Sequence, residues 1–433
     1  MKRKTSLAFS VLLCFFTVQL LTAGGTKDSS SGGAAARPTE ILLMSIGYTE
    51  ELDTFSAIID SFNAKNPDIH VTLEQVPGSW NDYNQKVISL ITAGTPPDIG
   101  RMMGPGQSAF VSRGQLLDLT PMVQRDIKMA DYYESAFESV KLDGRIYGVP
   151  TGIYTLNVYY NKKMFDEAGI PYPSADWNNP WTKEQFLETA RKLTSGSGPA
   201  KKYGFYANMD YGRSTPFFFG DGGDTFSPDR KSAAMDSKPL VDTYRMLQDL
   251  IKAGVSPSPA QLQAMPVDQL FMSGRLGMLI EGEWMMPPFT ANKELSFGVA
   301  PVPKGSQSAT TINYIDQWSV FSGSKHPDEA WKVVKYFIDN DAAELLIKNN
   351  VLGIPVNKTV ANRMKEFMFN PLSPAEKDVF LVSIEHSKSL YWHPKLGELG
   401  SSFWKNADLI SLNEITAEEG MKRINKEWND IIK

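Results

Sequence analysis

The sequence has 433 residues, which is too long for one ordinary hydrophobic core and fits two globular lobes. Hydrophobic residues make up 42% of the chain and charged residues 21%, which excludes wholesale disorder and a coiled coil. The formal net charge is −5, and it becomes more negative if a leader carrying Lys2, Arg3 and Lys4 is removed. This balance argues against duplex nucleic acid as a partner.

Residues 1–23 have the pattern of a secretory signal peptide: a basic start, an apolar stretch over 7–21 and small residues at the end. Residues 24–38 are rich in Ser, Gly and Ala and predict a flexible leader. The single cysteine, Cys14, lies within the signal peptide, and Gly24 stands where a lipoprotein carries its lipid-linked cysteine. We therefore predict a soluble protein exported to the periplasm or cell surface, with no lipid anchor and no disulfide.

The first half of the chain alternates between strand and helix patterns. Residues 41–46 form a short apolar run that predicts a buried strand, and residues 69–73 alternate as a second strand. Apolar residues recur at helical spacing over 50–66 and again over 83–91. This β-α-β-α order predicts a mostly parallel sheet with helices on both faces and ligands at the carboxyl ends of the strands.

The remainder of the chain continues as an α/β pattern. Strands are predicted over 146–150 and 156–160, and helices over 183–193, 239–252, 327–338 and at the C-terminus. Trp331 and Trp428 fall on the apolar faces of two of these helices, so we expect both in the core.

A search for catalytic motifs finds none in the chain after the leader. The zinc-protease, phosphate-loop, nucleophile-elbow and dinucleotide patterns are all missing from the sequence. Of the four histidines, His70 falls in a predicted strand and His326 at a helix start, positions typical of structural residues. We expect no enzyme, no metal and no cofactor. A secreted glycoside hydrolase with paired carboxylates is a remaining alternative, because the distance between carboxylates cannot be read from sequence.

Several aromatic residues lie beside Gly, Pro or polar residues instead of within an apolar stripe. Trp80, Trp284 and Trp392 have this setting, which suits a ring that faces a cleft. Aromatic faces pack against the C–H faces of sugars while nearby polar groups bind the hydroxyls. Core packing is the competing interpretation for each. Asp221 begins an Asp-Gly-Gly-Asp turn that lacks the closing Glu of a calcium loop, and it indicates either a turn beside a pocket or a plain turn.

Read in order, a set of short motifs resembles the extracellular solute-binding proteins of bacterial ABC sugar importers, the maltose-binding-protein-like family. The motifs are FNAKNP at 62–67, AGTPPDI at 93–99, YGVP at 147–150 with YYNK at 159–162, GDGG at 220–223, MLIEGEW at 278–284 and SKHPDEAW at 324–331. The resemblance implies a two-lobed periplasmic-binding-protein fold of type II, in which each lobe is a mostly parallel sheet flanked by helices. It implies a first lobe of 39–148 and 299–370, a second lobe of 149–298 and 371–433, and crossings near 147–150, 297–301 and 370–374.

The same resemblance implies a ligand site between the lobes. Carried over by position, its residues are Glu50, Trp80, Tyr154, Tyr211, Asp221, Trp284, Asp316 and Trp392. The sequence departs from maltose-binding members of the family at 101–104, where Met102 and Met103 offer no comparable polar contacts.

The implied function is capture of a sugar or oligosaccharide by a monomer, which closes its lobes and delivers the ligand to the membrane permease subunits. Alternatives are a binding protein for a polyamine, a metal ion or a glycerol phosphate. Four histidines argue against metal capture, and a phosphate ligand requires more arginines in the cleft than the sequence alone places there.

Overall fold

A computed structural model describes residues 37–47, 49–348, 353–367, 371–391 and 393–433. The predicted signal peptide and nearly all of the predicted leader lie outside these described residues. Pro38–Lys433 forms one compact unit, and it contains two large sheets, a third sheet of two strands and the candidate site.

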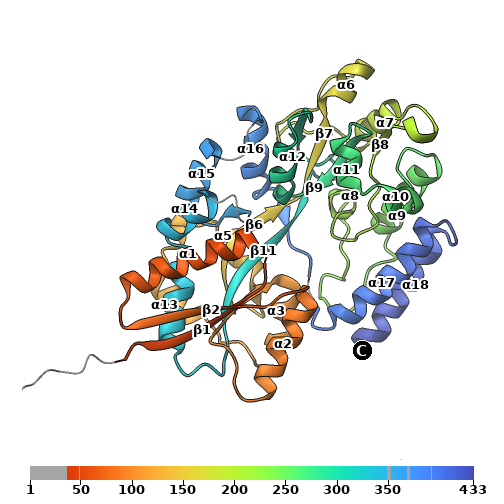
Figure 1. The fold of residues 1–433 in the computed structure, drawn as a ribbon. Coiled ribbons are helices and arrows are strands. Elements are labelled where there is room, and N and C mark those ends of the chain that lie inside the picture. Colours follow the sequence, from red (N-terminus) through yellow and green to blue (C-terminus); the bar gives the residue numbers. More distant parts are fainter. Residues whose placement is uncertain (1–36, 48, 349–352, 368–370, 392) are drawn as a thin grey trace, which may run out of the picture. The chain divides into compact units, whose positions relative to one another are not determined.

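The first sheet has the strand order β12-β6-β11-β3-β1-β2, and β13 pairs with one end of β11. Figure 1 labels β1, β2, β6 and β11 of this sheet. The two strands predicted at the start of the chain are confirmed as β1 and β2. Along β1 the side chains alternate, with Leu43 in the core under one face of the sheet and Met44 in the core under the other. The strands of this sheet are β1 (Thr39–Ser45), β2 (Ile69–Gln75), β3 (Ile99–Met103), β6 (Val149–Thr155), β11 (Thr311–Val320), β12 (Ile354–Pro355) and β13 (Ser387–Lys388).

Helices cover both faces of the first sheet. The helix expected over 50–66 is α1 (Thr49–Lys65), which buries Phe55 in the same core as Trp331 of α13 (Pro327–Tyr336). On the other face, α2 (Trp80–Thr92) and α3 (Gly104–Val111) bury Tyr83 and Phe110. Shorter elements complete this lobe: α4 (Thr120–Asp126), α5 (Glu134–Ser139), β4 (Lys141–Leu142), β5 (Arg145–Ile146), α14 (Asn340–Lys348) and α15 (Lys358–Phe367).

The second sheet has the order β10-β7-β9-β8, with β7 (Asn157–Asn161), β8 (Tyr203–Phe205), β9 (Leu276–Glu281) and β10 (Phe297–Ala300). Its larger core gathers α6 (Lys162–Ala168), α7 (Lys183–Leu193), α8 (Thr215–Gly220), α9 (Lys238–Lys252), α17 (Leu396–Ser411) and α18 (Ala417–Ile432). Helices α9, α17 and α18 pack together (Figure 1), and Trp428 is buried between them as expected. The remaining helices are α10 (Pro259–Ala264), α11 (Val267–Met272), α12 (Met286–Ala291) and α16 (Pro374–Ser383).

The two-lobed α/β class is confirmed, but both sheets are mixed and not mostly parallel. Strand β1 runs parallel to β2 and β3, whereas β11 runs antiparallel to β3 and β6. In the second sheet, β7 runs antiparallel to β9 and β10. The prediction of a mostly parallel first sheet was wrong because β11 returns from the second lobe and therefore runs antiparallel to its neighbours β3 and β6. Local sequence patterns do not record such a long-range connection.

The crossings between the sheets differ from the expected positions. Strand β6 begins at Val149, where the second lobe was expected to start, but it pairs within the first sheet. Only Leu156 separates β6 from β7 of the second sheet. The return path from β10 to β11 covers residues 301–310, directly after the second expected crossing. The third expected crossing begins at Asn370, which lies outside the described residues.

Helix α7 begins at a capping box, which gives a test away from the candidate site. The Thr182 hydroxyl accepts from the Gln185 backbone N–H at 3.2 Å, and the Gln185 side chain accepts from the Thr182 N–H at 2.8 Å. We expect Thr182→Ala to lower the free energy of unfolding by about 1 kcal/mol in urea denaturation. Thr92→Ala is the control, because the Thr92 hydroxyl bonds only the carbonyl of Ile88. Equal effects of the two substitutions would contradict the capping role.

Candidate functional site

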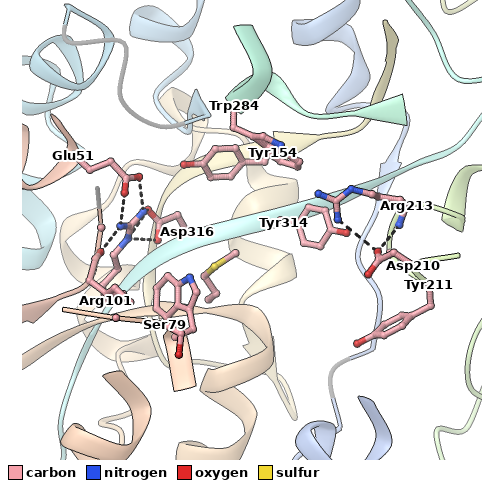
Figure 2. A pocket seen from close by; sticks show the side chains of 16 residues that line it. Glu51, Ser79, Arg101, Tyr154, Asp210, Tyr211, Arg213, Trp284, Tyr314 and Asp316 are labelled. Atoms are coloured by element: carbon pink, nitrogen blue, oxygen red, sulfur yellow. Dashed lines mark hydrogen bonds and ion pairs between the residues drawn. The ribbon is translucent and has the colours of Figure 1, made fainter. Parts of the chain in front are cut away.

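A cavity of about 660 Å³ lies between side chains of the two lobes. The first lobe contributes the end of β1, the starts of α1 and α2, and strands β3, β6 and β11. The second lobe contributes the loop before α8 and the 3₁₀ turn after β9. The lining residues are Ile46, Gly47, Glu51, Gly78, Ser79, Trp80, Arg101, Met103, Tyr154, Asp210, Tyr211, Gly212, Arg213, Trp284, Tyr314 and Asp316 (Figure 2).

Arg101 forms the centre of an ionic cluster on the first lobe. It lies on β3 and is 5% exposed, and its guanidinium lies over the rings of Phe55 and Trp80 at 5.0 and 5.7 Å. Its Nε and Nη2 donate to the two oxygens of Asp316 at 2.9 and 2.8 Å. The other donors reach the carbonyl of Ile46 at 2.7 Å and the carboxylate of Glu51 at 3.2 and 3.4 Å (Figure 2). This guanidinium therefore has no N–H left for a ligand.

The carboxylate of Asp316 is 1% exposed and depends on Arg101 for its charge balance. The register of β11 places Asp316 opposite Met103 of β3, and Arg101 lies two residues before Met103 and therefore on the same face of the sheet. Burial raises the pKa of Asp316, and the Arg101 guanidinium opposes that rise. For Arg101, burial tends to lower the pKa, but Asp316 and Glu51 outweigh it and raise the pKa. The three side chains form one hydrogen-bonded cluster with Arg101 at its centre.

A second ionic cluster lies on the other lobe, around Arg213. Its Nε donates to Glu281 at 2.7 Å, and its Nη1 lies 3.8 Å from Asp210. The other oxygen of Glu281 accepts from the Trp284 indole N–H at 3.2 Å, and the Arg213 guanidinium lies 5.9 Å from the Trp284 ring. Figure 2 shows Arg213 and Asp210 of this cluster across the cavity from Arg101. Burial tends to lower the pKa of Arg213, but Glu281 and Asp210 raise it.

Aromatic rings form the wall between the two clusters. The centroid of the Trp284 ring is 5.8 Å from Tyr154 and 6.3 Å from Tyr314. Tyr154 and Tyr314 are cross-strand partners on β6 and β11, so the register of the first sheet sets their positions. Trp284 is 36% exposed, whereas most large apolar side chains of the described residues are buried. An indole left open beside paired carboxylates is typical of a ligand-binding wall.

The structure brings five of the eight predicted site residues to the cavity: Trp80, Tyr154, Tyr211, Trp284 and Asp316. Glu50 lies in the first turn of α1, but its side chain is outside the description, and the next residue, Glu51, lines the cavity. Trp392 lies outside the described residues.

Asp221 is not among the residues that line the cavity, in contrast to the prediction. Its carboxylate bonds Lys183 of α7 and accepts from the backbone N–H of Ser306 at 2.7 Å. It thereby ties α7 and the end of α8 to the 301–310 segment between the sheets. Of the two interpretations of the Asp-Gly-Gly-Asp motif, these contacts favour the plain turn over a turn beside the pocket.

Sequence reasoning missed both arginines of the site. Residues 101–104 were weighed only for Met102 and Met103, although Arg101 is the central cation of the first cluster. A charged residue inside the otherwise apolar strand at 99–103 was the available signal, because such a charge is buried only when it is paired. Arg213 follows Tyr211 by two residues, so extension of that candidate along its loop also points to it.

Within the described part of the chain, no group of three or more His, Cys, Asp or Glu side chains is arranged to hold a metal ion. No helix there has the length and apolar character needed to cross a membrane.

The fold and the site define a two-lobed binding protein with its cavity between the lobes. The sequence matches the bacterial extracellular solute-binding protein family over residues 47–344, and the chain belongs to this family. It is 29% identical to a binding protein of Brucella abortus (78% of this chain, 84% of the relative) and 24% identical to the galactooligosaccharide-binding protein of Bacillus subtilis (81% and 80%). Among solved structures, an ABC substrate-binding protein from Listeria monocytogenes in complex with cycloalternan is similar, with a TM-score of 0.79 at 22% identity, covering 91% of this chain and 99% of that one.

Proposed function

We propose that this protein is the substrate-binding component of an ABC importer and that it captures a sugar or oligosaccharide in the cavity between its lobes. The observation that carries the proposal is the open indole face of Trp284, set between two clusters of paired carboxylates. An indole face packs on the C–H face of a sugar, and carboxylates accept hydrogen bonds from its hydroxyls. The sugar-binding names of the relatives support the same class of ligand.

The charges in the cavity favour a neutral ligand over an anionic one. Each cluster has two carboxylates and one guanidinium. In the first cluster Glu51 and Asp316 pair with Arg101. In the second cluster Asp210 and Glu281 pair with Arg213. A glycerol phosphate would therefore meet a surplus of negative charge, and the Arg101 donors are already used. This pairing, and not a shortage of arginines, is the argument against a phosphate ligand.

The ligand acts by holding the two lobes together. Leu156 and residues 301–310 are the connections about which the lobes close, and a solute that contacts both lobes stabilises the closed state by its differential affinity. The protein is exported by residues 1–23, works as a monomer outside the cytoplasm, and presents the closed state to membrane permease subunits. It releases its sugar chemically unchanged.

A thermal-shift screen of residues 24–433 tests this function. We expect one class among malto-, galacto- and chito-oligosaccharides to raise the melting temperature in a concentration-dependent way, because a ligand at 100 times its Kd adds about 2.7 kcal/mol to the stability. Chromatography should recover that sugar intact. A shift only with spermidine or glycerol 3-phosphate would overturn the sugar assignment, and shortened sugar products would instead indicate a hydrolase.

A further inference from the structure

Glu283 is a buried acid that the binding site does not use. It is the residue before Trp284 and is 3% exposed. Its carboxylate accepts from the backbone N–H of Thr155 at 3.1 and 3.3 Å and from the Thr155 hydroxyl at 2.8 Å. All three contacts join a residue of the second lobe to the last residue of β6 in the first sheet.

Thr155 lies at the point where the chain crosses between the sheets. Only Leu156 separates it from β7. Its hydroxyl oxygen also receives a hydrogen bond from the Asn157 amide at 3.2 Å and lies 2.5 Å from the Ser383 hydroxyl of α16. The carboxylate of Glu283 therefore belongs to a network that joins β6, β7 and α16 at the crossing.

The same two segments meet again inside the cavity. Trp284 follows Glu283, Tyr154 precedes Thr155, and the rings of Trp284 and Tyr154 lie 5.8 Å apart. Glu283 and Thr155 form the hydrogen-bonded contact at the crossing. Trp284 and Tyr154 form the aromatic wall of the cavity (Figure 2). A single peptide bond on each side therefore links the two contacts.

Among the described residues, Glu283 forms no ion pair, and its hydrogen-bond donors are the backbone N–H and hydroxyl of Thr155. Burial raises the pKa of Glu283 to about 7, and the hydrogen bonds from Thr155 oppose that rise. Tyr159 of β7 is the titratable group that interacts with Glu283 from the packed elements. The charge of Glu281 also acts on Tyr159, and Glu281 is itself paired with Arg213. A proton on Glu283 needs an acceptor, and the Thr155 hydroxyl oxygen already accepts from the Asn157 amide and lies 2.5 Å from the Ser383 hydroxyl oxygen.

We propose that Glu283 is a positioning residue that couples the crossing between the lobes to the tryptophan wall of the cavity, and that one proton on its carboxylate switches this coupling. The ionised carboxylate holds Thr155 and keeps Trp284 against Tyr154; the protonated one releases part of this network. The proposal rests on the cavity being the ligand site, but it holds for a sugar or any other solute.

The test is a pH titration of Trp284 without ligand. Residues 24–433 are labelled with 5-fluorotryptophan, and the ¹⁹F resonance of Trp284 is assigned by its loss in Trp284→Phe. We expect this resonance to titrate with one midpoint near neutral pH and to be flat in Glu283→Gln, which keeps an acceptor for Thr155. The exposed acid Glu294 supplies the control, and Glu294→Gln should titrate like the wild type. A wild-type resonance that does not move, or one that moves equally in Glu283→Gln, overturns the proposal.

Two further measurements guard against a variant that misfolds. Thr155→Val removes a donor that lowers the pKa of Glu283, so the midpoint should rise. The pKa of Glu283 in the folded protein lies above its ordinary value of 4.5. The contribution of Glu283 to the free energy of unfolding is therefore fully present below pH 4.5, and it is lost as the pH rises to about 7. The folding constant of wild type relative to Glu283→Gln should therefore fall by up to about tenfold per pH unit across this range. Neither readout needs a ligand, so a failed sugar screen leaves both intact.

Discussion

Arg101→Ala is expected to lower the free energy of unfolding by about 3 to 5 kcal/mol, measured by urea denaturation at pH 8. The substitution removes the cation from a cluster in which Asp316 is almost fully buried, and it leaves the carboxylates of Asp316 and Glu51 facing each other. It also empties the space between Phe55 and Trp80. The loss should shrink at lower pH, because the pKa of Asp316 is already raised by burial and without Arg101 its carboxyl is protonated more readily.

Arg423→Ala is the matched control for this experiment. Arg423 pairs with Glu419 one turn away on α18, where both side chains are about half exposed, so its loss should cost no more than about 0.5 kcal/mol. Adding Asp316→Asn to Arg101→Ala should recover part of the lost stability, since it removes the unpaired charge. Our account of the cluster is wrong if Arg101→Ala and Arg423→Ala have equal effects.

Trp284→Ala is expected to weaken binding of the captured sugar by about 1 to 3 kcal/mol, or roughly five- to 150-fold in Kd, measured by isothermal titration calorimetry. The variant loses the ring face that closes the cavity wall, while Glu281 still holds Arg213. Because the indole is 36% exposed, the melting temperature without ligand should change little.

The control for this prediction is Trp404→Ala. Trp404 is 43% exposed on α17 and is not among the residues that line the cavity. Its removal should leave the affinity unchanged. If Trp284→Ala unfolds the protein, or if both substitutions weaken binding equally, Trp284 is not a ligand-contacting residue.

Local sequence patterns predicted individual elements well but not the way the two sheets are joined. Helix α7 was predicted over the residues that it occupies, because Thr182 caps it and Phe186, Ala190 and Leu193 mark its buried face. The crossing at Leu156 was placed too early. Strands were predicted over 146–150 and 156–160, whereas β6 covers Val149–Thr155 and only Leu156 separates it from β7, so no turn residue marks the crossing.

The candidate site was predicted where loop aromatics revealed it and missed where ion pairs form it. Trp80 and Trp284 stood out because polar or turn residues flank them. Arg101 and Asp316 are 215 positions apart and meet only through the pairing of β3 with β11, so neither residue marks the other locally. Glu50 was chosen from the sequence, whereas the next residue, Glu51, lines the cavity, and sequence patterns do not fix the start of a helix to one residue.

A crystal structure of residues 24–433 with the sugar that stabilises the protein most tests the central claim directly. We predict one sugar ring packed on the Trp284 indole, with hydroxyls within about 3.2 Å of the carboxylates of Glu51, Asp210 or Asp316. Density for the sugar at any other place on the protein, with this cavity free of sugar at a saturating concentration, would contradict the account.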